Sequence, residues 1–430
     1  MKILVFLTNL GLGGTEKAAC RWAWGMKQRG HQVEVFTMEE GPRRAELEQH
    51  SIPVRMVGAD VAFIANGLRE FQPDIIHVHS PGHPYQGDIL GEALKALPKK
   101  IPVVQTNVFG HLWNWKEDGW TDFRLFISWT SCVQAARRVL LPLDGDFFQR
   151  NSVAVYPLDA SEPFLAAEVA AFRHQHGIAD DEVLYGRFSR PDPAKWTNLA
   201  LDAFRIAARR SPNIKLLLRE PPPHIADELR GSPDAGRFVI LPATADPDEL
   251  RLTMSAIDIG LHTSSIGESF GYGIAELMNL GKPVITHSVP WHDQAQIELV
   301  RHGECGFIAS TPAMMARAIL TLADEPDLRA SMGHAGRDHV RQLADPDNSI
   351  VRMEKVFQTV LSGGLNPFAD EDLRQARATA KYLDSQQFGH SIHEQVKLRA
   401  LHLRARFFQL RELRRARAKN SARTANIRCL

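Results

Sequence analysis

Two carboxylates, Glu268 and Glu276, stand eight positions apart in an otherwise apolar and glycine-rich stretch, GESFGYGIAELMNLGKPVI. An acid beside a core needs polar partners, because an unpaired buried charge is unfavourable. Sugar hydroxyls are suitable partners, since a carboxylate can accept two of their hydrogen bonds at once. The pattern therefore predicts a site that binds a molecule rich in hydroxyl groups.

The element that positions these acids is a helix that follows a buried strand. IDIGLHT predicts the strand, and we expect the helix to begin near Phe270 or Gly271, with Glu268 just before it and Glu276 on its second turn. The free N–H groups of a helix N-terminus, with about half a positive charge behind them, attract phosphate. We therefore expect one acid to bind a hexose and the other a ribose. Alternatively, the first acid only stabilises the helix start and the second is a surface acid.

A second motif, GRFSRPDPAKW, also follows a strand and precedes a helix. It contains Arg187, Arg190 and Lys195. A planar guanidinium and a mobile ammonium together suit a diphosphate. The alternative is a solvated basic loop.

A third motif, GLGGTE, opens the first helix of the chain. Gly13 and Gly14 permit a close approach between backbone and ligand, next to a helix N-terminus that attracts anions. A dinucleotide fingerprint would need glycine where this chain has Glu16, which disfavours a Rossmann dehydrogenase. A tight turn between strand and helix is the alternative.

The plan of strand, loop and helix runs along the chain twice. KILVFLT, HQVEVFT, IPVRMV, DIIHVHS and IPVVQT predict one set of strands, and EVLYGRF, NIKLLLR, RFVILPA, IDIGLHT and KPVITH predict another. The runs are apolar rather than alternating, as in parallel sheets covered on both faces. We expect an α/β fold of two tandem Rossmann-like, doubly wound domains facing a central cleft. The expected domains are 1–160, 161–362 with a last helix that could pack back on the first domain, and a helical basic extension over 363–430.

The composition, 44% hydrophobic and 23% charged, is typical of a soluble globular protein. No apolar run approaches the roughly 20 residues of a membrane span, and the N-terminal run lacks a signal-cleavage pattern. Four scattered cysteines fit a reducing cytoplasm. These features predict a cytoplasmic protein.

The C-terminal tail is strongly basic. Residues 391–430 carry eleven Lys and Arg against two Glu, although the whole chain has a net charge of only +1. LRALHLRARFFQL interleaves apolar and basic residues, as in helices that lie on an anionic bilayer. A peripheral position on the inner face of the membrane is therefore one expectation. A helix packed on the protein body and a disordered end are the alternatives, and nucleic-acid binding is not expected.

Together these motifs resemble glycosyltransferase family 4, retaining enzymes of the GT-B fold that use nucleotide-sugar donors. The resemblance rests on GLGGTE, DIIHVHS, GRFSRPDPAKW, the E-x7-E motif of GESFGYGIAE with LMNLGKPVI, and LVRHGECGFI, and it covers about residues 1–360. It implies a UDP- or GDP-linked sugar as donor substrate, with no cofactor and no metal. The implied acceptor is a glycan or lipid-linked molecule in bacterial cell-surface polysaccharide synthesis.

The resemblance also implies a role for each motif. The nucleotide would lie mainly on the second domain and the acceptor on the first. The basic residues of the second motif would bind the donor diphosphate, and the glycine loop would approach the diphosphate or sugar. The implied catalytic residues are Glu268, Arg187, Lys195 and Asn107, and the implied donor-binding residues are Gly13, Gly14, Phe270, Gly271 and Glu276. In this scheme Glu268 contacts the transferred sugar and Glu276 the ribose.

Two departures from the family pattern are visible. The family usually has a histidine after the strand that corresponds to VVQT. This chain has Asn107 at that position, and His111 follows four residues later. Asn107 could still donate hydrogen bonds to the sugar. The spacing from Arg187 to Lys195 is also wider than usual, through an insertion around residues 191–193.

Two further patterns could suggest a metal site, but neither is strong. His77 and His79 face the same side of a predicted strand, but no third ligand is evident, so packing or cleft lining is the expected role. Short D-x-D matches begin at Asp144, Asp246 and Asp345, and we expect these to be chance matches.

Other functions remain open at this point. One is a GT-B-fold epimerase or hydrolase acting on a nucleotide sugar, which would need acid and base residues that the sequence does not reveal. Another is an inactive transferase-like subunit acting through its basic tail. The intact set of two acids and two cations in the motifs argues against the inactive subunit.

Overall fold

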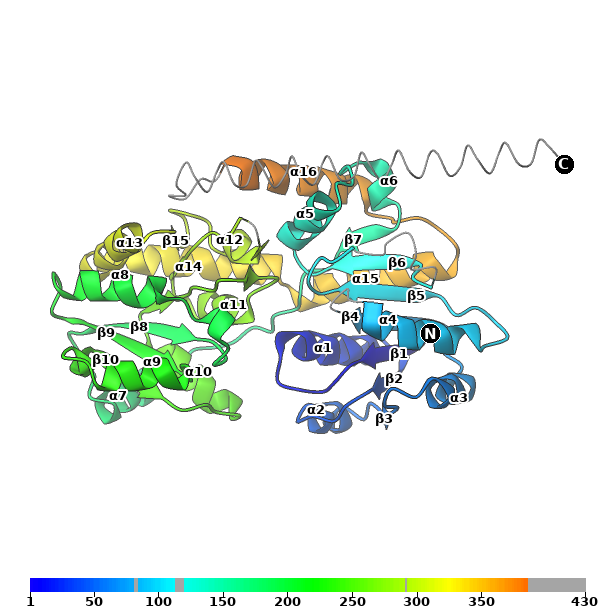
Figure 1. Ribbon diagram of the computed structural model, residues 1–430, viewed down its shortest axis with the longest axis horizontal. Coiled ribbons are helices and arrows are strands. Elements are labelled where there is room, and N and C mark those ends of the chain that lie inside the picture. Colours follow the sequence, from blue (N-terminus) through cyan, green and yellow to red (C-terminus); the bar gives the residue numbers. More distant parts are fainter. Residues whose placement is uncertain (81–83, 113–119, 291, 386–430) are drawn as a thin grey trace.

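The computed structural model describes residues 1–80, 84–112, 120–290 and 292–385. Within these ranges the chain forms one large parallel sheet in each half, and helices cover both faces of the two sheets (Figure 1). This arrangement confirms the predicted fold of two Rossmann-like domains. The basic segment 391–430 lies outside the described residues.

The first sheet contains seven strands. They are Lys2–Leu7 (β1), Gln32–Thr37 (β2), Val54–Met56 (β3), Ile75–Ser80 (β4), Val103–Asn107 (β5), Phe123–Phe126 (β6) and Asn151–Val153 (β7). Their order is β3-β2-β1-β4-β5-β6-β7. The accompanying helices are Gly14–Gln28 (α1), Arg44–Gln49 (α2), Val61–Phe71 (α3), Pro84–Lys95 (α4), Trp129–Arg138 (α5) and Gly145–Phe148 (α6).

The second sheet contains six strands. They are Val183–Phe188 (β8), Ile214–Arg219 (β9), Phe238–Leu241 (β10), Ile259–Leu261 (β11), Val284–Thr286 (β13) and Gly306–Ile308 (β15), in the order β10-β9-β8-β11-β13-β15. Gly267–Glu268 (β12) and Asp293–Gln294 (β14) form a separate short pair. The helices are Ala166–Gln175 (α7), Pro193–Lys195 (η1), Asn198–Ala208 (α8), Pro223–Arg230 (α9), Ala235–Arg237 (η2), Pro247–Ala256 (α10), Tyr272–Asn279 (α11), Ala295–Leu299 (α12), Pro312–Asp324 (α13), Pro326–Leu343 (α14), Pro346–Leu361 (α15) and Ala369–Ser385 (α16).

The central strands are apolar on both sides because each side meets a layer of helices. In β1, Ile3 and Val5 belong to one buried cluster, whereas Leu4 and Phe6 belong to another. Burying one such side chain stabilises the fold by roughly 1.5–3 kcal/mol. Continuous apolar runs therefore fix the two sheets, and the carboxyl ends of their strands carry the polar loops.

The last two helices return to the first domain, as Figure 1 shows for α15 and α16. Helix α15 packs on α1, where Trp22 Nε1 donates a hydrogen bond to Ser349 Oγ at 2.9 Å. Helix α16 packs on α5 and α6, and its buried Asp372 accepts a hydrogen bond from Ser152 Oγ at 2.7 Å. Among the helices of the described ranges, none is long and apolar enough to cross a membrane.

Direct contacts join the two domains beside β12. Glu298 on α12 accepts hydrogen bonds from the backbone N–H groups of Trp129, at 3.2 Å, and Thr130, at 2.8 Å, at the start of α5. Ser128 Oγ donates to the carbonyl of Ser269 at 2.7 Å. Because Ser269 directly follows β12, these contacts hold the acid-bearing loop of the second domain against the first.

Candidate active site

Glu268 is the centre of a cluster of polar side chains at the carboxyl end of the second sheet. Its Oε1 atom lies 2.8 Å from Lys195 Nζ and 3.0 Å from His262 Nε2. Burial would raise the pKa of this carboxyl group, but the hydrogen bond with His262 and the charge of Lys195 outweigh burial and lower the pKa to about 2. Glu268 is therefore ionised at neutral pH.

The second carboxylate oxygen of Glu268 is differently placed. Within the described part of the chain, Oε2 makes no hydrogen bond, and the side chain keeps 17% of its surface exposed. The backbone N–H of Glu268 donates to Gln296 Oε1 at 3.0 Å, which fixes the main chain. In Glu268, Oε1 is therefore bound to Lys195 and His262, whereas Oε2 can accept hydrogen bonds from a ligand.

Lys195 occupies the end of η1, in the loop after β8. Its ammonium contacts Glu268 and the carbonyl of Gly267, the latter at 3.2 Å. An ammonium group has three N–H donors, so these two contacts leave one donor for an anion. The wider spacing of the motif therefore still brings Lys195 to the predicted site.

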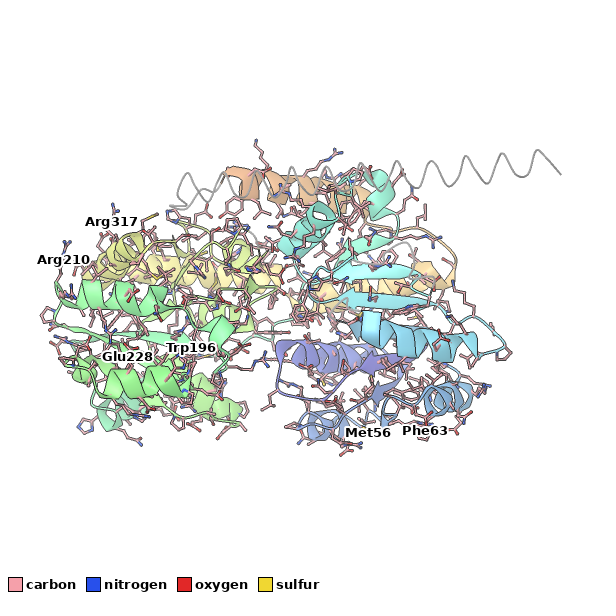
Figure 2. All side chains as sticks on the ribbon, in the orientation of Figure 1. Met56, Phe63, Trp196, Arg210, Glu228 and Arg317 are labelled. Atoms are coloured by element: carbon pink, nitrogen blue, oxygen red, sulfur yellow. The ribbon has the colours of Figure 1, made fainter. Side chains whose placement is uncertain are left out.

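Arg187 is buried rather than part of a solvated loop, with 1% of its surface exposed. Its Nη2 atom donates to the carbonyls of Lys195, at 2.5 Å, and Thr263, at 2.6 Å, and its guanidinium stacks on Trp196 at 4.4 Å. Figure 2 labels Trp196, at the end of the same loop. Burial lowers the pKa of Arg187 to about 9, opposed by the charge of Glu268, so the group stays protonated at neutral pH. Among the described residues, its buried Nε and Nη1 atoms have no hydrogen-bond partner.

The helix after Glu268 begins slightly later than expected. Helix α11 starts at Tyr272. Gly271 is the N-terminal capping residue, and its φ of 96° lies outside the helical range. An L side chain would be strained at this φ, so glycine is required at the helix start. Phe270 is buried, with 3% exposure. The helix start thus lies within one or two residues of the predicted position near Phe270 or Gly271, and the helix N-terminus follows Glu268.

Glu276 forms an ion pair between the two domains. Lys17 on α1 places its Nζ atom 2.5 Å from Glu276 Oε1, and the same ammonium lies 5.0 Å from the ring centre of Tyr272. The side chains of Lys17 and Glu276 are 40% and 24% exposed. Glu276 is thus a partly buried acid at the domain interface rather than a simple surface acid.

The glycine loop brings the first domain against α11. Gly13 precedes α1 as its N-terminal capping residue. A Cβ atom on Gly14 would lie 2.9 Å from Cδ2 of Tyr272, which is closer than real contacts of this kind. Gly14 therefore permits the N-termini of α1 and α11 to meet. The first carboxylate of α1, Glu16, is partly buried, and burial raises its pKa.

Asn107 ends β5 but has no contact with the cluster around Glu268 within the described residues. Its Nδ2 atom donates to the carbonyl of His111 at 2.7 Å, and its Oδ1 atom accepts from the N–H of His111 at 3.1 Å. Both ends of the amide are therefore used to hold the loop after β5. A direct contact between Asn107 and a sugar stays a prediction.

The patterns that suggested a metal have structural explanations. Asp144, Asp246 and Asp345 each accept hydrogen bonds from backbone N–H groups at the start of a helix, α6, α10 and α15 respectively. His77 and His79 are buried with ring centres 4.4 Å apart, and burial lowers the pKa of both. Among the described residues, no group of three or more His, Cys, Asp or Glu could hold a metal ion.

Sequence reasoning missed three residues of this region. His262 follows β11 directly, and a polar residue at the carboxyl end of a buried strand is a signal that could have identified it. Gln296 and Glu298 lie on α12, a five-residue helix without a recognisable motif. Their partners are distant in sequence, so no local pattern indicates them.

Each half of the chain matches the model of a known protein family. Residues 12–142 match the model of Glycosyltransferase Family 4, and residues 181–325 match that of Glycosyl transferases group 1. The chain belongs to glycosyltransferase family 4. The two matches cover the glycine loop on the first domain and the Arg187, Lys195, Glu268 and Glu276 positions on the second.

Several solved structures share the fold of this chain. HepE from Anabaena, solved in complex with UDP and glucose, matches with a TM-score of 0.66 and 20% identity over 83% of this chain and 99% of that one. A glycosyltransferase from Rickettsia africae ESF-5 matches with a TM-score of 0.69 and 14% identity over 84% and 98%. Sucrose-phosphate synthase from Thermosynechococcus elongatus matches with a TM-score of 0.66 and 16% identity over 85% and 100%. A search among curated proteins found no significant match.

Proposed function

We propose that this glycosyltransferase moves a sugar, with retention of configuration and without a metal ion, from a UDP- or GDP-linked donor to a glycan or lipid-linked acceptor. The observation that carries the proposal is the arrangement around Glu268, where an ionised acid with one uncommitted oxygen lies beside Lys195 and Arg187. Support also comes from HepE, whose structure has been solved with UDP-glucose.

Each part of the donor has a partner of matching chemistry in this site. The N–H donors that Lys195 and Arg187 leave uncommitted suit the diphosphate. Glu268 Oε2 suits a hydroxyl of the transferred sugar. Glu276 suits the ribose, and the N-terminus of α11 behind Gly271 suits a phosphate oxygen.

The reaction breaks the bond between C1 of the sugar and the β-phosphate oxygen, and the electron pair leaves with the phosphate. Arg187 and Lys195 stabilise the negative charge that grows on the leaving diphosphate. The acceptor hydroxyl attacks C1 from the same face, and its proton passes to the leaving phosphate oxygen. Retention follows from this same-face attack. Exclusion of water between the domains prevents hydrolysis of the donor.

The biological setting belongs to the same proposal. A lipid-linked or surface-glycan acceptor would suit a protein on the cytoplasmic face of a membrane, and the basic segment 391–430 supplies the charge for such contact. Bacterial cell-surface polysaccharide synthesis is the process we infer. The acceptor would enter from the first domain, where Asn107 ends β5.

A donor panel tests this function. With EDTA present, we expect UDP-glucose or GDP-mannose, but not ADP-glucose, to raise the melting temperature and to release its nucleoside diphosphate once acceptor is added. Glu276→Ala should abolish the shift. The matched control is Glu228→Ala on α9, because this exposed glutamate forms an ion pair with Arg205 on the second domain (Figure 2). No response from the folded wild type to any donor would contradict the proposal, and a response that requires a divalent cation would contradict metal independence.

The ion pair between Lys17 and Glu276 gives a second prediction. Lys17 forms an ion pair with Glu276, the acid that we assign to the ribose, so the donor must displace the Lys17 ammonium. Partly exposed ion pairs contribute up to about 1 kcal/mol, so Lys17→Met should bind the donor roughly two- to fivefold more tightly. Isothermal titration measures this change, and Lys27→Met on the same helix is the control, since Lys27 contacts the Ser51 carbonyl instead. Weaker binding by Lys17→Met would show that Lys17 contacts the donor itself.

A further inference from the structure

His262 is a buried histidine whose two ring nitrogens both face side-chain partners. Nε2 lies 3.0 Å from Glu268 Oε1, and Nδ1 lies 3.3 Å from Thr286 Oγ1 at the end of β13. The residue is 8% exposed, and Thr286 is fully buried. The backbone N–H of His262 donates to the carbonyl of Ile285 at 2.9 Å, which anchors the residue in the sheet.

The chemistry of the partners decides the tautomer of this ring. An ionised carboxylate can only accept hydrogen bonds, so Nε2 must carry the proton that faces Glu268. Nδ1 is then the acceptor, and the Thr286 hydroxyl donates to it. Burial lowers the pKa of His262 against the opposing hydrogen bond with Glu268, which agrees with a neutral ring that carries one proton.

Two donors therefore compete for the same oxygen of Glu268. Lys195 forms an ion pair with Oε1 and His262 a hydrogen bond with the same atom, and no described residue makes a hydrogen bond with Oε2. Rotation of the carboxylate would break both contacts, so the pair of donors fixes its plane. The backbone of Glu268 is fixed separately by Gln296, which is fully buried.

We propose that His262 is a positioning residue that holds Glu268 so that Oε2 faces the transferred sugar, with Thr286 selecting the required tautomer. This inference rests on the proposed function, because it assigns a specificity role toward the sugar half of the same donor. It predicts that His262 acts on recognition of the sugar and leaves recognition of the nucleotide unchanged.

The test compares nucleotide sugars with their bare nucleoside diphosphates on the full chain. UDP-glucose with UDP and GDP-mannose with GDP are titrated into wild type, His262→Leu and His262→Gln. For the pair that wild type binds, His262→Leu should lose about tenfold in affinity for the nucleotide sugar and about tenfold in kcat, the size expected for a hydrogen bond to a charged group. Its affinity for the nucleoside diphosphate should not change. His262→Gln should recover most of the loss, because its amide offers an N–H donor at similar reach.

Two controls separate positioning from folding. In the Glu268→Gln background, His262→Leu should add little further loss, because the carboxylate that it orients has been removed. His77→Leu removes a similarly buried contact, between His77 Nε2 and Thr106 Oγ1 at 2.7 Å, and should change the melting temperature without changing the preference for the sugar.

Equal losses for nucleotide sugar and nucleoside diphosphate, or a His262→Leu protein that behaves as wild type, would overturn the positioning role while leaving the proposed function intact. A fully additive loss in the Glu268→Gln background would also overturn it. Failure of wild type to bind either pair would overturn the proposed function together with this inference.

Discussion

Glu268→Gln should reduce sugar transfer by about 100-fold or more, the size seen when one charge-stabilising group is removed from an active site. The substitution keeps the shape of the side chain but removes the negative charge that lies 2.8 Å from Lys195. It also leaves that ammonium without its carboxylate at a largely buried position. The initial rate of nucleoside diphosphate release in the presence of acceptor measures the effect.

Glu354→Gln is the matched control for this variant, because the two glutamates have similar partners. Glu354 also contacts a histidine and a cation, His31 at 2.7 Å and Arg29 at 2.5 Å, but it lies on α15 against the first domain. Glu354→Gln should lower stability without changing the rate per folded molecule. If both variants lost activity equally, the effect of Glu268 would be structural, and the account of its role would be wrong.

The lowered pKa of Glu268 adds a dependence on pH. A carboxyl group whose pKa is lower in the folded state contributes stability above its unfolded pKa, and loses it as pH falls through the folded value. The stability difference between wild type and Glu268→Gln should therefore be constant from neutral pH to about 5 and shrink between the ordinary value of 4.5 and about 2. Chemical unfolding at a series of pH values measures this difference.

Arg187→Met should have the second large effect, a loss on the order of 10²–10³ in kcat. The substitution removes a buried positive charge that we assign to the leaving diphosphate. It also leaves the carbonyls of Lys195 and Thr263 without their donor, at about 1–3 kcal/mol for each unsatisfied group. The loops that carry Lys195 and Glu268 would then lose one of their connections, while the contacts of Lys195 with Glu268 and with the Gly267 carbonyl remain.

Arg187→Lys should rescue only part of this loss. An ammonium retains the charge but lacks the planar guanidinium, whose Nη2 atom reaches both carbonyls and whose face stacks on Trp196. Arg173→Met is the matched control, because Arg173 donates to the Ala256 carbonyl at 3.0 Å and to the Glu182 carbonyl at 2.5 Å, in contacts with α10 and the start of β8. A variant at Arg187 that still turned over the donor at the wild-type rate would exclude the proposed role in charge stabilisation.

The sequence predicted most strands of the two sheets, because a strand buried on both faces is visible as a local run of apolar residues. Apolar runs such as those of β1 and β4 can only be buried between two layers, and each occurs where it was expected. The strands β6, β7 and β15 were missed, whereas β3 and β13, which are equally short, were predicted from the longer runs IPVRMV and KPVITH. Of these, β7 and β15 are edge strands, and their position depends on the strands already in place.

The site was predictable where its residues lie close together in sequence. Arg187 and Lys195 stand in one motif, and Glu268 stands directly before α11, so their common location follows from the carboxyl ends of parallel strands. Partners from other parts of the chain were not predictable. Lys17 meets Glu276 across 259 positions, through contacts between the domains that include the packing of Gly14 against Tyr272.

Asn107 shows a different limit of sequence reasoning. Its type allows it to bind a sugar, and its place at the end of β5 is correct. Sequence alone does not reveal that both ends of its amide bind the backbone of His111. A short polar side chain satisfies its own loop as readily as it binds a ligand, because the two uses involve the same hydrogen bonds.

The most direct test of the central claim is a crystal structure of the protein with the donor identified by the panel. The account predicts a ribose hydroxyl at Glu276 with Lys17 displaced, the diphosphate at Lys195 and Arg187, and the sugar against Oε2 of Glu268. A donor bound elsewhere, or one bound with the pair of Lys17 and Glu276 still intact, would contradict it.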